Sequence, residues 1–98
     1  MPLTPKQRQF LKALAHPLAA VVRVGKGGIT PAVVAETKRS LDAHELIKIR
    51  IETDDSETRQ ELADQLAADT DSHVAGVIGK VVILYRERDE DPRIKLPV

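Results

Sequence analysis

The chain has 98 residues, with 15 basic and 15 acidic side chains and no cysteine. This length suits one domain with a single core, and the lack of cysteine excludes disulfides and thiolate metal sites. No apolar run is long enough to span a membrane, and the N-terminal residues lack the apolar stretch of a signal peptide. We therefore expect one soluble, cytoplasmic domain over residues 1–98, with a core over 1–86 and a charged tail over 87–98.

The charges are unevenly distributed along the chain. Residues 1–50 have nine Lys/Arg and three Asp/Glu, a net charge of +6, whereas residues 51–98 have six and twelve, a net charge of −6. This asymmetry predicts a cationic face for an anionic partner and a separate acidic, solvated face. Chance segregation of charge among exposed helices is the alternative.

The first half of the chain alternates helical and strand patterns. Thr4 followed by Pro5 and Gln7 predicts a helix with a capping box, which ends by residue 16 because a proline follows. Its expected apolar stripe is Phe10, Leu11 and Leu14. A β-branched strand over 21–24 stops at glycines, and Thr30 and Pro31 then open a second helix to about residue 43.

The second half continues the alternation and ends in a hairpin. "LIKIRI" over 46–51 predicts a strand with its isoleucines facing the core, and Asp54 with Glu57 predicts the N-terminus of a third helix. Residues 73–86 read as two strands joined at Gly79-Lys80, which suits a type II′ turn. The tail is expected to be loose, although Ile94 and Leu96 are candidates for docking on the body.

These elements predict an α/β fold in the order α-β-α-β-α-β-β. Strand–helix–strand units favour parallel pairing, and the terminal hairpin is antiparallel. We therefore expect a four-stranded mixed sheet packed with helices.

The glycine-rich loop Gly25-Lys26-Gly27-Gly28 is the main candidate site. Glycine lets the backbone approach a ligand, and successive N–H groups in such a turn bind phosphate. We place more weight on the loop amides and Lys26 than on the following helix end, because Pro31 has no N–H and Thr30 is engaged in capping. A plain strand-to-helix turn is the alternative, and the spacings of a P-loop and of a dinucleotide fingerprint are absent.

Basic residues on several predicted elements extend this site toward a polyanion larger than a nucleotide. The expected RNA-binding residues are the loop with Thr30, together with Arg23, Lys6, Arg8, Lys12, Lys38, Arg39, Lys48 and Arg50. Phe10 and Tyr85 are the only aromatic residues, so contacts to phosphate, sugar and RNA shape are expected rather than base stacking.

Catalysis and metal binding are not expected. The three histidines have no metal-ligand spacing, and no Ser or Thr has the partners of an activated nucleophile. We predict no catalytic residue, no metal, no cofactor and no small-molecule substrate.

The segments "LAHPLAAVVRVGKGGIT", "LDAHELIKIRI", "VIGKVVILYR" and "IKLP" resemble the YhbY family. These proteins are the bacterial stand-alone form of the chloroplast RNA splicing and ribosome maturation (CRM) domain. The resemblance implies a fold similar to the C-terminal domain of translation initiation factor 3 and binding to precursors of the large ribosomal subunit. It also implies that residues 25–28 form the family's Gly-x-x-Gly loop, which is likened to the RNA-binding loop of KH domains.

The leading interpretation is thus a monomeric, non-enzymatic RNA-binding protein that acts on the precursor large-subunit particle. The first alternative is a protein-interaction module that uses the acidic third helix, with Asp64, Asp69 and Asp71. The second is a small phosphometabolite enzyme that uses the glycine loop, which lacks an acid/base pair.

Overall fold

The computed structural model describes residues 2–98 and confirms the predicted α/β architecture. The elements are α1 (Pro5–Ala15), β1 (Ala20–Val24), α2 (Pro31–His44), β2 (Leu46–Ile51), α3 (Ser56–Thr70), β3 (His73–Ile78) and β4 (Val81–Tyr85). The strands form one sheet in the order β1-β2-β4-β3, so β1 and β3 are its two edges. β1 and β2 are parallel, whereas β4 is antiparallel to both β2 and β3.

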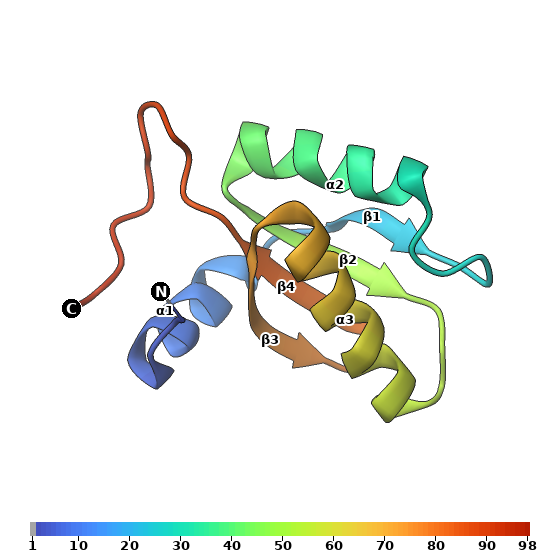
Figure 1. Ribbon diagram of the computed structural model, residues 1–98. Helices are drawn as coiled ribbons and strands as arrows, with labels where there is room; N and C mark the ends of the chain where they lie inside the picture. The colour runs from blue at the N-terminus through green and yellow to red at the C-terminus, as the bar shows by residue number, and fades with distance from the viewer. Residues whose placement is uncertain (1) are drawn as a thin grey trace.

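Helices cover both faces of the sheet (Figure 1). On one face, α2 and α3 pack against Ile47, Ile49 and Ile51 of β2, which alternate along the strand as predicted. On the other face, Leu11 and Ala15 of α1 form a second cluster with residues of β2, β3 and β4. We call these two sides the α2–α3 face and the α1 face.

Two helix starts follow the predicted capping, and the third differs. Thr4 and Gln7 form the capping box of α1, and Thr30 caps α2 by accepting a hydrogen bond from the Val33 N–H at 3.2 Å. The predicted cap of α3 is wrong: Asp55, not Asp54, accepts from the Thr58 N–H. Asp54 instead lies 2.9 Å from the Lys80 ammonium in the β3–β4 turn, which occupies its carboxylate.

The predicted apolar stripe of α1 is only partly buried. Leu11 is fully buried, whereas Phe10 and Leu14 are exposed. The side chain that completes the contact is Ala15, one turn after Leu11. Because α1 crosses one face near the sheet edge, only a narrow strip of the helix contacts the sheet. The apolar side chains beside that strip, Phe10 and Leu14, therefore remain exposed to solvent.

The C-terminal segment is bound to the body, in contrast to the expected loose tail. Ile94 and Leu96 pack against the α1 cluster, as the docking alternative predicted. The buried Glu45 carboxylate also accepts hydrogen bonds from the backbone N–H groups of Arg88, Arg93 and Ile94. None of the helices within residues 2–98 combines the length and apolar character required to cross a membrane.

Candidate functional site

The glycine-rich loop projects from the end of β1 and leads into α2 (Figure 1). The Gly28 N–H donates to the Gly25 carbonyl at 3.1 Å, which closes a four-residue turn. Ile29 then packs against the core, and an ideal Cβ on Gly28 would lie 4.0 Å from Leu62 of α3. The end of the loop is therefore anchored, while Lys26 and Gly27 at its tip are exposed.

The fold does not require glycine equally at the three glycine positions of the loop. Gly28 has a φ of +69°, which residues with a side chain rarely adopt. Gly25 and Gly27 do not have a positive φ. A Cβ on Gly25 would meet nothing within 4 Å, and a Cβ on Gly27 would make only ordinary contact with Thr30. Of the three loop glycines, the fold requires only Gly28.

The tip of the loop presents unpaired donors. Within residues 2–98, the hydrogen bonds of the structure use neither the Lys26 nor the Gly27 backbone N–H. Lys26 forms no ion pair in the same part of the chain, so its ammonium adds a solvated positive charge beside these donors. Adjacent free N–H groups with a neighbouring cation are a suitable environment for a phosphate oxygen.

Arg23 and Arg50 lie beside the loop on the α1 face. They are aligned in the β1–β2 pairing, and both approach the Glu52 carboxylate, with the Arg23 Nε at 3.7 Å and Arg50 hydrogen-bonded to it. The hydrogen bond from Arg50 is the main cause of the lowered pKa of Glu52. Burial opposes it, and the charges of Arg50, Arg23 and Lys80 each lower the pKa further by a smaller amount. Arg23 remains largely exposed, so its outer donors are accessible.

Lys48 has a structural partner. Its ammonium donates to the His16 carbonyl at 3.1 Å and to the Leu18 carbonyl at 3.0 Å. It therefore caps the C-terminal end of α1, where a cation is favourable.

The basic residues of α1 lie at the opposite edge of the sheet from the loop. Arg8 and Lys12 line a groove between α1 and β3, and Lys6 is exposed on the same helix. These side chains share the α1 side of the sheet with Arg23, Lys48 and Arg50. The structure thus brings together the predicted residues of α1, β1 and β2 on one side.

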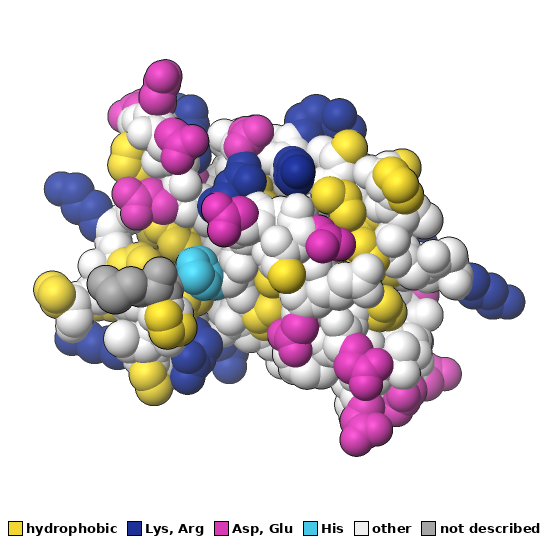
Figure 2. All heavy atoms as spheres, in the orientation of Figure 1, with side chains coloured by type: hydrophobic (Ala, Val, Ile, Leu, Met, Phe, Trp, Pro, Cys, Tyr) yellow, Lys and Arg dark blue, Asp and Glu magenta, His cyan; other side chains and the backbone are white. Residues whose placement is uncertain are grey.

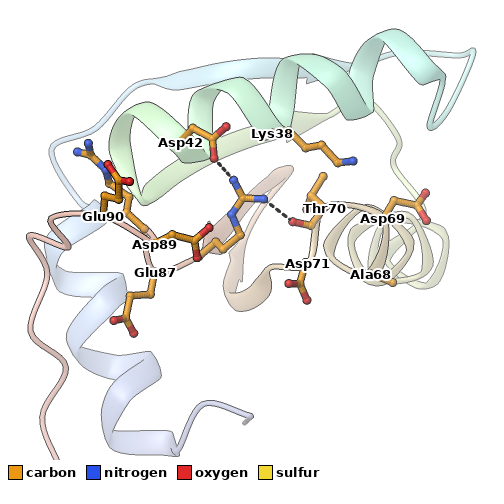
Figure 3. A pocket seen from close by; sticks show the side chains of 11 residues that line it. Lys38, Asp42, Ala68, Asp69, Thr70, Asp71, Glu87, Asp89 and Glu90 are labelled. Atoms are coloured by element: carbon orange, nitrogen blue, oxygen red, sulfur yellow. Dashed lines mark hydrogen bonds and ion pairs between the residues drawn. The ribbon is translucent and has the colours of Figure 1, made fainter.

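Lys38 and Arg39 lie on α2, which covers the other face of the sheet. Lys38 borders a groove of about 680 Å³ between α2, α3 and the C-terminal segment, and acidic side chains that include Asp42, Asp69 and Asp71 line the same groove (Figure 3). Within this groove, Arg86 binds both the Asp42 carboxylate and the Thr70 carbonyl. Figure 2, from the side of α3, shows acidic side chains over α3 and the C-terminal segment.

Two residues that lie near the predicted cations, Glu52 and Gly76, were not predicted from the sequence as part of the site. Glu52 follows Arg50 by two positions, and the period of a strand places such residues on the same face. Gly76 interrupts an otherwise apolar strand pattern, and an isolated glycine there indicates a bulge or a close approach. Among residues 2–98 the structure has no group of three His, Asp or Glu side chains placed to hold a metal ion.

Comparison with known proteins identifies the family. The CRS1 / YhbY (CRM) domain matches residues 3–86 of the chain. A Haemophilus influenzae protein named "RNA-binding protein" is 41% identical over 95 residues, covering 97% of this chain and 95% of its own. "Probable RNA-binding protein YqeI" of Bacillus subtilis is 35% identical, covering 97% and 99%.

A solved structure shows the same fold. The solution structure of SAV1595 from Staphylococcus aureus has a TM-score of 0.87 and 36% sequence identity, and the match covers 97% of this chain and 99% of that one. The predicted resemblance is confirmed, and the chain belongs to the CRS1/YhbY (CRM) domain family.

Proposed function

We propose that this protein binds RNA without catalysing a reaction and that it acts in the assembly of the large ribosomal subunit. Its family and the names of its relatives support RNA as the ligand. The resemblance of the chain to the YhbY family supports the precursor large-subunit particle as the place of action. The expected form is a monomer whose phosphate contact is made by residues 25–28.

The observation that carries this proposal is the pair of glycines that the fold does not require. Glycine in ordered structure costs about 0.5–1 kcal/mol relative to alanine, and nothing around Gly25 or Gly27 in the protein compensates for this cost. A backbone that must lie against a ligand supplies the reason. The free N–H groups of Lys26 and Gly27 and the charge of Lys26 indicate that the ligand is anionic.

Replacement of Lys26 by Gln tests the proposal. The variant removes one cation from an exposed loop, so we expect an unchanged fold, severalfold weaker binding, and a salt dependence shallower by about one unit of slope. Filter binding to in vitro transcribed large-subunit ribosomal RNA at a series of salt concentrations measures both quantities. Lys95→Gln is the matched control, since Lys95 is also exposed but lies in the C-terminal segment. Equal binding by both variants and the unmodified protein would remove Lys26 from the site.

A protein-interaction role remains the second candidate because of the acid-lined groove in Figure 3. Such a groove complements a basic segment of a ribosomal protein. Retention of the protein on ribosomal particles after digestion of exposed RNA separates the two functions. Loss of the protein with the RNA supports the leading proposal, and retention supports the groove.

A further inference from the structure

A groove of about 420 Å³ follows the free edge of the sheet along β3. Its floor is formed by Val74–Val77 of β3. Arg8, Gln9 and Lys12 of α1 form one wall, and Gln60 of α3 lies at the other. The groove is therefore built from three elements and lies at the opposite sheet edge from the glycine loop.

The position of Lys12 depends on the absence of a side chain at Gly76. An ideal Cβ on Gly76 would lie only 2.9 Å from both Cγ and Cδ of Lys12, so the aliphatic part of the lysine rests directly on the strand backbone. The register of β3 against β4 also shifts between Val74 and Gly76, which marks a bulge. Bulges and strand glycines are often found where a side chain is redirected or a ligand approaches.

The groove has an uncompensated positive charge. None of the residues that line it is acidic, and within residues 2–98 neither Arg8 nor Lys12 forms an ion pair. Arg8 uses one guanidinium nitrogen to donate to the Leu3 carbonyl at 2.8 Å, which fixes the side chain and leaves donors for a ligand. The Gln9 amide adds a neutral donor, whereas the Gln60 amide already donates to the Asp64 carboxylate at 3.0 Å.

We propose that this groove is a second RNA contact, in which Arg8 and Lys12 bind phosphates of the sugar-phosphate backbone. The two cations are one helical turn apart on the same face of α1, about 5–6 Å between Cβ atoms, which is comparable to the spacing of neighbouring phosphates along a strand. An acidic peptide is less suitable, because the bulge interrupts the regular hydrogen-bonding edge that an added strand requires.

The inference rests on the proposed RNA-binding function and gives it a geometry. Three strand spacings, about 14 Å in total, separate the edge strands β1 and β3. Arg23, Arg50 and Lys12 all lie on the α1 side of the sheet, between these two edge strands or on them. An RNA that contacts the glycine loop and the groove therefore crosses the α1 face of the sheet.

A double-mutant cycle between Lys12 and Gly76 tests the site. Lys12→Gln removes the charge, whereas Gly76→Ala retains the charge and displaces the side chain that carries it. We expect each single variant to weaken binding to the large-subunit ribosomal RNA transcript by about threefold to tenfold, and the double variant to be no weaker than Lys12→Gln. Lys12→Gln should also reduce the salt slope by about one unit, and Lys95→Gln should change neither quantity. Circular dichroism and thermal melts show whether each variant is folded.

The outcomes separate this inference from the proposed function. Unchanged affinity of Lys12→Gln while Lys26→Gln weakens binding would overturn the second contact and leave the function standing. Additive losses from Lys12→Gln and Gly76→Ala would overturn the role of Gly76 in placing the lysine. Absence of RNA binding by the unmodified protein would overturn both the function and the inference.

Discussion

The loop glycines separate the demands of folding from those of the proposed RNA contact. Gly28 has a positive φ, and an L-residue in this conformation costs about 1–2 kcal/mol. Gly25 and Gly27 have room for a methyl group and no such strain. Substitution by alanine therefore has opposite expected consequences within one turn of four residues.

We expect Gly28→Ala to lower the free energy of unfolding by about 1–2 kcal/mol, because its backbone conformation must be retained with a Cβ present. Gly25→Ala and Gly27→Ala should instead raise the free energy of unfolding by about 0.5–1 kcal/mol, because alanine fits both positions without strain and restricts the unfolded chain. Both variants should weaken RNA binding severalfold, because a methyl group holds the ligand away from the backbone. Urea denaturation and filter binding measure the two effects on the same samples. Full RNA affinity in Gly25→Ala and Gly27→Ala would mean that the ligand does not approach this backbone.

At the scale of elements, Glu45 joins α2, β2 and the C-terminal segment. It is almost fully buried at the end of α2 with a φ of 64°, and its carboxylate accepts N–H groups from Arg88, Arg93 and Ile94. Burial alone would raise the pKa of Glu45, but the three backbone donors and the charge of Arg88 outweigh it and lower the pKa below its ordinary value of 4.5. The ionised carboxylate is thus the form that holds the segment in place.

A lowered pKa in the folded state means that Glu45 contributes stability above its unfolded pKa and loses that contribution as the pH falls through the folded pKa. We expect Glu45→Gln to lower the free energy of unfolding by about 1–3 kcal/mol near neutral pH, because at least one partly buried N–H loses its acceptor. The difference between the variant and the unmodified protein should shrink below about pH 4.5. Urea denaturation across pH measures this convergence, and a constant difference down to pH 2 would show that ionisation of Glu45 is not its cause.

The order and type of the elements could be predicted from sequence because hydrophobic period, capping residues and glycines all indicated the same boundaries. The strand "LIKIRI" and the capping box at Thr4 and Gln7 are examples in which local chemistry decides the structure. The bound tail was missed because its anchor is a single carboxylate more than 40 positions away in sequence. Asp54 was mistaken for a cap because its partner, Lys80, lies in a distant turn.

The loop of the candidate site was equally visible in sequence, but the grouping of the basic residues was not. Lys12 and Gly76 are 64 positions apart and meet only because α1 crosses β3. Lys48 looked like a free strand cation, yet its ammonium is engaged by two carbonyl groups at the end of α1. Packing between segments that are distant in sequence decides which cations remain free to bind a ligand. The order of charges along the chain does not reveal this packing.

At the scale of the whole molecule, the opposite charges of the two halves are sorted between the two sides of the sheet. The α1 side has most of the predicted cations, whereas the α2–α3 side carries the acidic residues of α3 and the groove of Figure 3. Lys38 and Arg39 are the predicted cations that lie on this acidic side. If the proposed RNA contact lies on the α1 face, the acidic side repels the RNA, and the charge pattern would orient the complex.

Two double variants with the same change in charge test this orientation. Arg23→Gln with Lys12→Gln removes two cations from the α1 side, and Lys38→Gln with Arg39→Gln removes two from α2. If RNA lies on the α1 face, the first pair should reduce the slope of log affinity against log salt by about 1.4–1.8, and the second should reduce it by less than half as much. Filter binding over a salt series gives both slopes from one preparation of transcript. A larger change from the α2 pair would place the RNA on the α2–α3 face, and equal changes would mean that binding has no preferred side.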